Sequence, residues 1–172
     1  MNKQQTEINS AAPDLETRLV EEDHHSIKLW LRLLTCSSLV EAELRNRLRE
    51  EFDTTLPRFD FLSQLQRAPK GLTMGELSRR MMVSGGNVSG LSTQLVKEGL
   101  VSRSTLPEDR RTYMVTLTPT GKKFFEKIAK RHEEWVIELL GDLSHDDVDQ
   151  IADLLAKVKT TVSKHSVTGG GR

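Results

Sequence analysis

The sequence predicts a mainly α-helical protein with one small β element, an α+β fold, and three observations support this expectation. Apolar residues recur at helical spacing in two long segments, residues 26–52 and 119–162. Between these segments, short runs begin with residues that cap helices. Two β-branched segments, at residues 101–105 and 113–117, flank a polar turn and are typical of a hairpin.

The N-terminal third is expected to contain an arm, a long helix and a shorter helix. Residues 1–23 are polar and lack a helical stripe, so we expect a flexible arm there. Residues 24–56 form the next segment, in which a helix is expected from about Ser26 to Phe52. Pro57 suits the first turn of a following helix. That helix carries the apolar residues Phe59, Phe61, Leu62 and Leu65.

Two short helices and a tight turn precede the hairpin. Thr73 and Glu76 match the capping box that starts a helix. Ser84, in the turn Val83–Gly86, is the expected cap of the second helix. Gly99 is an effective end for that helix, and the hairpin follows it. Three apolar residues share one side of the second helix and should pack into the domain: Val88, Leu91 and Leu95.

The chain after the hairpin is expected to form two helices within residues 119–163 and a disordered tail at residues 164–172. Thr118 and Pro119 supply a cap and a proline at the first helical position. Ser144 starts the final amphipathic helix with a second capping pattern. The buried side of the first of these helices should carry Phe124, Ile128, Trp135 and Leu139.

The two terminal helical segments are interpreted as dimerisation elements. Within one chain, neither has enough partners to cover its apolar face. Pairing two copies would cover both faces, so residues 24–56 and 119–163 are assigned to dimerisation and the protein is expected to be a homodimer.

Composition excludes several classes of protein. No apolar run approaches the roughly 20 residues of a membrane span, and the start MNKQQTEINS lacks the apolar core of a secretory signal, so a cytoplasmic protein without a membrane segment is expected. A single cysteine, Cys36, excludes an internal disulfide framework. The five histidines lack metal-ligand spacing, so no metal is expected. No phosphate-cradling loop, G-x-S-x-G motif or Cys/His pairing indicates an enzyme or a bound cofactor.

Positive charge gathers in the middle of the chain although the formal net charge is zero. Residues 70–111 contain seven cations and four anions, a net charge of +3, whereas residues 1–69 carry −3. Pairs of short helices next to a basic hairpin are typical of DNA-binding proteins, because one helix fits the major groove and cations can reach a neighbouring groove. We therefore expect double-stranded DNA to be the partner.

The motifs of this region resemble the multiple-antibiotic-resistance-regulator (MarR) family of winged-helix regulators. The resemblance rests on LTMGELSRRMMVSGGNVSGLSTQLVKEGLVSR followed by PEDRRTYMVTLTPTGKK, and it extends over about residues 26–162. It implies a winged helix-turn-helix lobe at residues 57–118, flanked by the long dimerisation helices. It also implies a homodimeric repressor that binds a pseudo-palindromic operator and is released by a small molecule.

Candidate DNA contacts come from the second helix of the motif and from the hairpin tip. Polar residues opposite its apolar side can read bases, and small residues there let the backbone approach DNA. The candidate contacts from this helix and its cap are Ser84, Gly86, Asn87, Ser89, Gly90, Thr93 and Gln94. The family resemblance places Arg111 in the minor groove, with Asp109 holding its guanidinium and Arg110 near phosphate. Phosphate contacts are also expected from Thr73 and Arg79, and from Ser63 and Lys70.

An aromatic effector is the second expectation from the resemblance. The segment IKLWLRLLTCSSLVEAELRNRLREEFDTTLPRFDFLSQL resembles the subgroup that controls aromatic-acid catabolism, which implies an aromatic acid or its coenzyme A thioester as ligand. Aromatic walls and cationic side chains that could bind such a ligand are His24, His25, Trp30, Arg32, Arg58, Phe59 and Phe61. Each of these residues also has an ordinary interpretation as core or solvated surface.

Two alternative functions remain open at this point. Cys36 could make the protein redox-responsive, although no adjacent His or Lys activates its thiol and an inert cysteine is the simpler interpretation. A winged helix can also serve only protein interaction, which the basic D-R-R tip disfavours.

Overall fold

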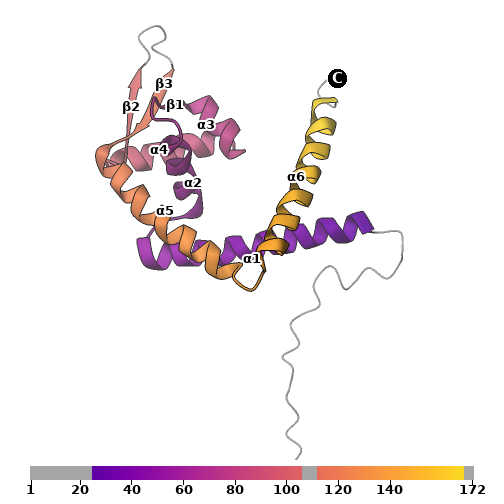
Figure 1. Cartoon of the computed structure of the whole chain (residues 1–172). Helices are drawn as coiled ribbons and strands as arrows, with labels where there is room; N and C mark the ends of the chain where they lie inside the picture. Colours follow the sequence, from indigo (N-terminus) through magenta and orange to yellow (C-terminus); the bar gives the residue numbers. More distant parts are fainter. Residues whose placement is uncertain (1–24, 106–111, 169–172) are drawn as a thin grey trace, which may run out of the picture. The chain divides into compact units, whose positions relative to one another are not determined.

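The computed structural model describes residues 25–105 and 112–168 and confirms the mainly helical fold with a small antiparallel sheet (Figure 1). The helices and strands, in chain order, are α1 His25–Phe52, α2 Leu56–Gln66, β1 Leu72–Thr73, α3 Met74–Met81, α4 Gly85–Lys97, β2 Val101–Thr105, β3 Tyr113–Leu117, α5 Pro119–Leu139 and α6 His145–Thr168. None of these helices is long and apolar enough to cross a membrane.

The sheet is made of three antiparallel strands in the order β1-β3-β2. Val101 pairs with Leu117 and Thr105 with Tyr113, so the expected hairpin strands are in register over their full length. The sequence pattern did not reveal β1, which has two residues and pairs Leu72 with Val115. This short strand joins the start of α3 to the hairpin.

The chain divides into two compact units, one up to Ile128 and one from Ala129 onward. The boundary therefore falls inside α5. The first unit holds the elements from α1 to the start of α5, and its core gathers residues from nearly all of them. The fully buried side chains include Leu48, Phe61, Leu62, Leu77, Leu95 and Ile128.

The start of α5 is packed through Phe125 and not through Phe124. Phe125 is buried and its ring lies 5.5 Å from that of Phe59, whereas the expected Phe124 is only half-buried. Leu139 is also half-buried, while Ile128 and Trp135 are buried as expected. Neighbouring residues on a helix point about 100° apart, so only one of the two adjacent phenylalanines can face the core. The packing partners of the helix decide which one it is.

The second unit contains the remainder of α5 and α6. Ser144 and Asp147 form the expected capping pattern, with the Ser144 hydroxyl donating to Asp147 Oδ2 at 2.6 Å. This bond and the hydrogen bond that the Ser144 backbone N–H donates to the same carboxylate lower the pKa of Asp147. The helix continues to Thr168, so it includes residues 164–168 that the sequence assigned to a disordered tail. Residues 145–168 contain no glycine or proline, so the sequence offers no strong helix breaker in this stretch.

Candidate nucleic-acid interface

The first helix of the motif, α3, starts with the predicted capping box. The Thr73 hydroxyl accepts from the Glu76 backbone N–H at 3.3 Å, and the Thr73 backbone N–H donates to Glu76 Oε2 at 2.8 Å. These hydrogen bonds hold the pKa of Glu76 below its usual range. The Thr73 hydroxyl also donates to the same carboxylate at 2.8 Å, so its single O–H hydrogen is used in positioning α3.

The turn between α3 and α4 holds a methionine in a conformation that usually favours glycine. Met82 has φ +55° and donates its backbone N–H to Arg79 at 3.3 Å. The Ser78 hydroxyl closes the turn by donating to the Val83 carbonyl at 2.6 Å. The Met82 side chain is 92% exposed, so its packing does not compensate for the backbone strain.

Ser84 caps the second helix, α4, as predicted, and the polar residues of this helix are exposed except for Ser92. The Ser84 hydroxyl accepts from the Asn87 backbone N–H at 3.4 Å. A helix of 13 residues is about 20 Å long, which suits the major groove. All six proposed recognition residues of this helix are exposed: Gly86, Asn87, Ser89, Gly90, Thr93 and Gln94.

The buried side of α4 differs from the expected one at a single position. Val88 and Leu95 are fully buried as predicted, but the third buried residue is Ser92. Leu91 is half-buried and lines a hollow of about 390 Å³ that Pro57 and Gln94 also line. The sequence thus predicted Leu91 as the third core residue, whereas the structure has its neighbour Ser92 in that place.

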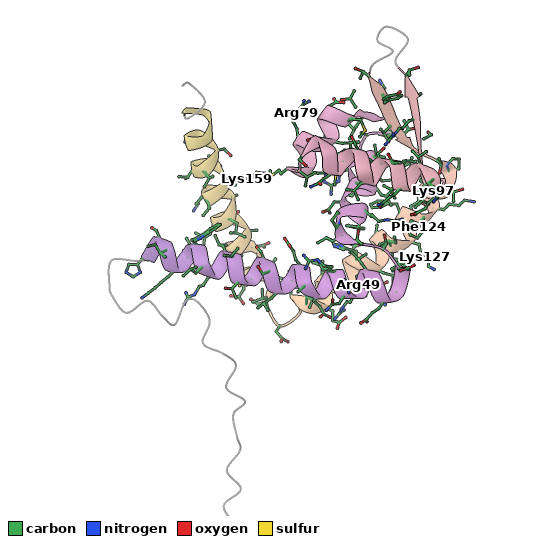
Figure 2. All side chains as sticks on the ribbon, turned by 180° about the vertical axis from the view of Figure 1, so that it is seen from behind. Arg49, Arg79, Lys97, Phe124, Lys127 and Lys159 are labelled. Carbon is green, nitrogen blue, oxygen red and sulfur yellow. The ribbon has the colours of Figure 1, made fainter. Side chains whose placement is uncertain are left out.

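The exposed surface of α4 is divided into three strips. At about 100° per residue, the strip opposite the core carries Gly86, Gly90 and Lys97. Ser89 and Thr93 lie toward the hairpin, and the third strip carries Asn87 and Gln94 above the hollow just described. Lys97 was not predicted as a contact, although it is exposed. Figure 2 shows Lys97 and Arg79 at opposite ends of the α3–α4 pair.

Arg103 on β2 ties the hairpin to α4, and sequence reasoning missed this role. Its Nε donates to the hydroxyl of the buried Ser92 at 2.9 Å. Its Nη2 donates to the Ser89 carbonyl at 3.2 Å and to the Thr93 hydroxyl at 3.0 Å. Because the Thr93 hydroxyl also donates to the Ser89 carbonyl at 2.9 Å, it is committed within the protein. The sequence signal for this contact was the position of Ser92 on the same side of the helix as Val88 and Leu95.

The base of the hairpin is joined to α4 and α5 through Thr118. Its hydroxyl donates to the Gly99 carbonyl at 2.6 Å and accepts from the Gly121 backbone N–H at 2.9 Å. Its backbone N–H donates to the Leu100 carbonyl at 3.1 Å. A Cβ on Gly121 would lie 1.8 Å from the Leu100 oxygen, so only glycine fits. These contacts explain the threonine and the glycine in the stretch LTPTGK, residues 117–122, which belongs to the segment that carries the family resemblance.

The proposed effector residues that the structure describes do not form one cluster within a single chain. His25, Trp30 and Arg32 are exposed on the first turns of α1, with Trp30 59% exposed. Phe59 and Phe61 are buried in the core. None of these five lines the hollow beside α4.

Arg58, the remaining described effector candidate, is half-buried and forms an ion pair with Glu98, the C-terminal cap of α4. Its guanidinium therefore links α2 to the second helix of the motif. Its Nε is buried without a hydrogen-bond partner among the described residues.

The hairpin tip and one histidine lie outside the described residues. Asp109, Arg110 and Arg111 belong to the segment 106–111, and His24 precedes α1. Among the phosphate candidates that are described, Arg79 and Lys70 are exposed and Ser63 is half-buried.

Comparisons with known proteins agree on one family. A profile described as "MarR family" matches residues 54–113. The "Transcriptional activatory protein BadR" of Rhodopseudomonas palustris is 30% identical over 134 residues, which is 76% of each chain. A crystal structure of a MarR family transcriptional regulator from Silicibacter pomeroyi is 31% identical, with a TM-score of 0.72, and covers 83% of this chain and 99% of its own. Wild-type apo MarR from E. coli has a TM-score of 0.66 at 28% identity, covering 74% and 94%.

Proposed function

The chain belongs to the MarR family of transcriptional regulators, and from this premise we propose that it is a homodimeric repressor released by an aromatic effector. Members of this family bind DNA, usually act as dimers and are not enzymes. DNA binding therefore takes precedence over a module used only for protein interaction.

One observation carries the proposal for how DNA is read. The polar surface of α4 is exposed from Gly86 to Gln94, and Arg103 fixes its orientation relative to the hairpin. Asn87 and Gln94 are free to bond to adenine edges, whereas the Thr93 hydroxyl is occupied and its methyl group remains for an apolar contact. Gly86 and Gly90 let the helix backbone approach the groove closely.

The hairpin tip is proposed to enter the minor groove through Arg111. A gel-shift titration with fragments of the native promoter tests this, because Arg111→Ala should weaken operator binding strongly while leaving the fold intact. Arg45→Ala, which removes an exposed arginine of α1, is the matched control. Binding by the parent should also weaken steeply with salt, since phosphate contacts release counterions. If Arg111→Ala binds the operator as tightly as Arg45→Ala and the parent do, the hairpin tip takes no part in the mechanism.

Homodimerisation is proposed on the strength of apolar surface that one chain leaves uncovered. Large apolar residues of α6 are exposed in the single chain, namely Val148, Ile151, Leu154, Leu155 and Val162. A helix normally buries such a stripe, so a second copy is the proposed cover. Leu154→Lys should shift the protein toward monomer in sedimentation experiments, whereas the neighbouring exposed change Asp153→Lys should not. A monomeric parent protein at micromolar concentration would contradict the proposal.

The proposed effector is an aromatic acid or its coenzyme A thioester, which rests on the subgroup resemblance of residues 27–65. Gel shifts of the protein–operator complex in the presence of a panel of aromatic acids and thioesters test this proposal, because the effector should release the operator. The relative from Rhodopseudomonas palustris is named as an activatory protein, so a promoter–reporter assay should accompany the gel shifts. A rise in reporter output on deleting the regulator supports repression, and a fall supports activation.

A redox alternative depends on Cys36, which is an exposed free cysteine on α1. Operator binding before and after peroxide treatment, in the parent and in Cys36→Ser, separates it from the effector proposal.

A further inference from the structure

The outer end of the β2–β3 hairpin carries polar side chains that the fold itself does not use. The hairpin stands beside α4 (Figure 1) and is bonded to it through Arg103. Thr105 and Tyr113 form the last described pair before the segment 106–111, and both are exposed, Tyr113 by 46%. Neither residue was among the DNA contacts that the sequence indicated.

The register of the hairpin decides which way these side chains point, because cross-strand partners share one face of a sheet and successive pairs alternate between faces. Arg103 is paired with Val115. Val115 is fully buried and Arg103 bonds to α4, so this face is turned toward the helix. Two residues further out, Thr105 is paired with Tyr113 and lies on the same face. Ser104, between them, belongs to the opposite face.

The polar residues of this face, Arg103, Thr105 and Tyr113, retain hydrogen-bond donors for another molecule. Arg103 uses Nε and Nη2 for its bonds to α4. These two nitrogens form one edge of the planar guanidinium, so Nη1 and its two N–H groups lie away from that edge. Within residues 25–105 and 112–168, neither Nη1 nor the hydroxyls of Thr105 and Tyr113 make a hydrogen bond.

The charge of this region favours an anion. Ser89 and Thr93 form the strip of α4 that lies toward the hairpin, and the Arg103 guanidinium is bonded to both residues. The strip and the hairpin face together contain one cation and no carboxylate. A guanidinium that three bonds hold in place, with two hydroxyls further out on the same face, is a surface that suits phosphate oxygens.

The geometry of a DNA duplex places a phosphate strand next to this face. A helix in the major groove and a hairpin tip in the neighbouring minor groove have one sugar–phosphate strand between them, because that strand separates the two grooves. In the proposed complex α4 and the tip occupy these grooves, so the strand passes along the hairpin face turned toward α4. A strand rises about 3.4 Å per residue, which puts Thr105 and Tyr113 about 7 Å beyond Arg103 along this path.

From these observations we infer that the hairpin face turned toward α4 is a phosphate-binding surface that holds the DNA strand between the two grooves. Arg103 Nη1 donates to one phosphate, and the hydroxyls of Tyr113 and Thr105 donate to its neighbour on the same strand. The inference rests on the proposed binding of DNA by α4 and the hairpin tip. It adds a contact that carries no sequence information, because phosphates are the same at every base pair.

The first experiment removes one hydroxyl and measures affinity for two DNA duplexes of equal length, one from the native promoter and one of unrelated sequence. Tyr113→Phe keeps the ring and loses only the hydroxyl. It should weaken binding to both duplexes by the same factor, about three- to tenfold for one hydrogen bond to a charged group. Ser104→Ala, which removes an exposed hydroxyl from the opposite face of the same hairpin, is the matched control and should bind as the parent does.

The second experiment adds a cation and measures how binding depends on salt. Thr105→Lys places an ammonium on the face turned toward α4, so binding should tighten and the slope of log affinity against log salt concentration should steepen by about 0.9, the value for one further neutralised phosphate. Ser104→Lys, with the same charge on the opposite face, should keep the slope of the parent. Far-UV circular dichroism checks that all the variants are folded.

The outcomes separate this surface from the proposed function. Equal losses on both duplexes in Tyr113→Phe, with a steeper salt slope in Thr105→Lys only, would support the surface. If Tyr113→Phe binds as the parent does, or weakens binding to the promoter fragment alone, the phosphate contact is wrong and the proposed function stands. Equal salt slopes in Thr105→Lys and Ser104→Lys also count against it. If the parent binds neither duplex, both proposals are overturned.

Discussion

The hydrogen bond between Arg103 and Ser92 leads to a quantitative prediction of how much the contact between the hairpin and α4 contributes to the free energy of unfolding. Arg103→Met keeps most of the apolar stem of the side chain and removes its three hydrogen bonds to α4. The Ser92 hydroxyl, which is fully buried, then loses its partner. Ser92→Ala instead removes the buried hydroxyl and leaves Arg103 with its bonds to Ser89 and Thr93.

The expected free energies follow from which groups are left unpaired. A buried polar group without a partner costs about 1–3 kcal/mol, and an ordinary hydrogen bond contributes about 1 kcal/mol. Arg103→Met should therefore lower the free energy of unfolding by about 2–3 kcal/mol, and Ser92→Ala by about 1 kcal/mol. The double variant has no orphaned hydroxyl and should be more stable than the sum predicts, with a coupling of about 1–2 kcal/mol.

Urea unfolding followed by far-UV circular dichroism measures all four proteins, at one fixed protein concentration because subunit association contributes to stability. Gel shifts on the same samples should show weaker operator binding for Arg103→Met. Strictly additive free energies, with a coupling below about 0.5 kcal/mol, would refute the reasoning that the guanidinium satisfies the buried hydroxyl.

Three further predictions concern the turn, the glycine contact and the capping box. Met82→Gly should raise the free energy of unfolding by about 1 kcal/mol, because glycine adopts a positive φ without strain; a lower urea midpoint would contradict this. Gly121→Ala should destabilise by more than about 3 kcal/mol through its clash with Leu100, whereas Gly90→Ala, with nothing within 4 Å of its Cβ, should melt no earlier than the parent. The pKa of Glu76 is lowered in the folded state, so its contribution is present above the unfolded pKa and is lost as pH falls through the folded pKa. The urea-midpoint difference between the parent and Glu76→Gln should therefore shrink between about pH 6 and pH 3, and a constant difference would contradict it.

Features that depend on a few neighbouring residues were predictable from the sequence. The capping residues Thr73, Ser84 and Ser144 each begin the expected helix, because a cap is decided within one turn of chain. Pro57 lies in the first turn of α2 for the same local reason. The mainly helical fold class and its small sheet followed from these signals together with the spacing of apolar residues.

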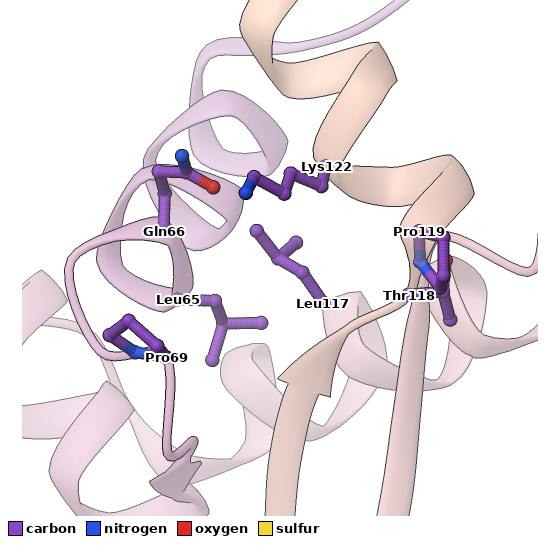
Figure 3. Close-up of a pocket in the computed structure, with 7 residues that line it drawn as sticks. All are labelled: Leu65, Gln66, Pro69, Leu117, Thr118, Pro119 and Lys122. Carbon is purple, nitrogen blue, oxygen red and sulfur yellow. The ribbon is translucent and has the colours of Figure 1, made fainter.

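Features that depend on distant residues were not predictable. Periodicity favoured Leu91 as a core residue, whereas the core takes Ser92 because Arg103, from another element, satisfies the hydroxyl. The two residues of β1 are a strand only because β3 lies beside them. The hollow lined by Leu65, Leu117 and Lys122 (Figure 3) was equally hidden, since Leu65 is far from the other two in the chain and meets them only when α2, β3 and α5 are placed.

The contact of Gly121 with Leu100 also limits how this chain can change in length. Thr118 and Gly121 span one helical turn: Thr118 is hydrogen-bonded to the backbone that follows α4, and Gly121 lies too close to that backbone for a side chain. An insertion of one residue between them would rotate all later residues of α5 by about 100° about the helix axis. Every apolar residue after that point would then face a different direction. Among related sequences, the number of residues between these two positions should stay constant even where loops elsewhere lengthen or shorten.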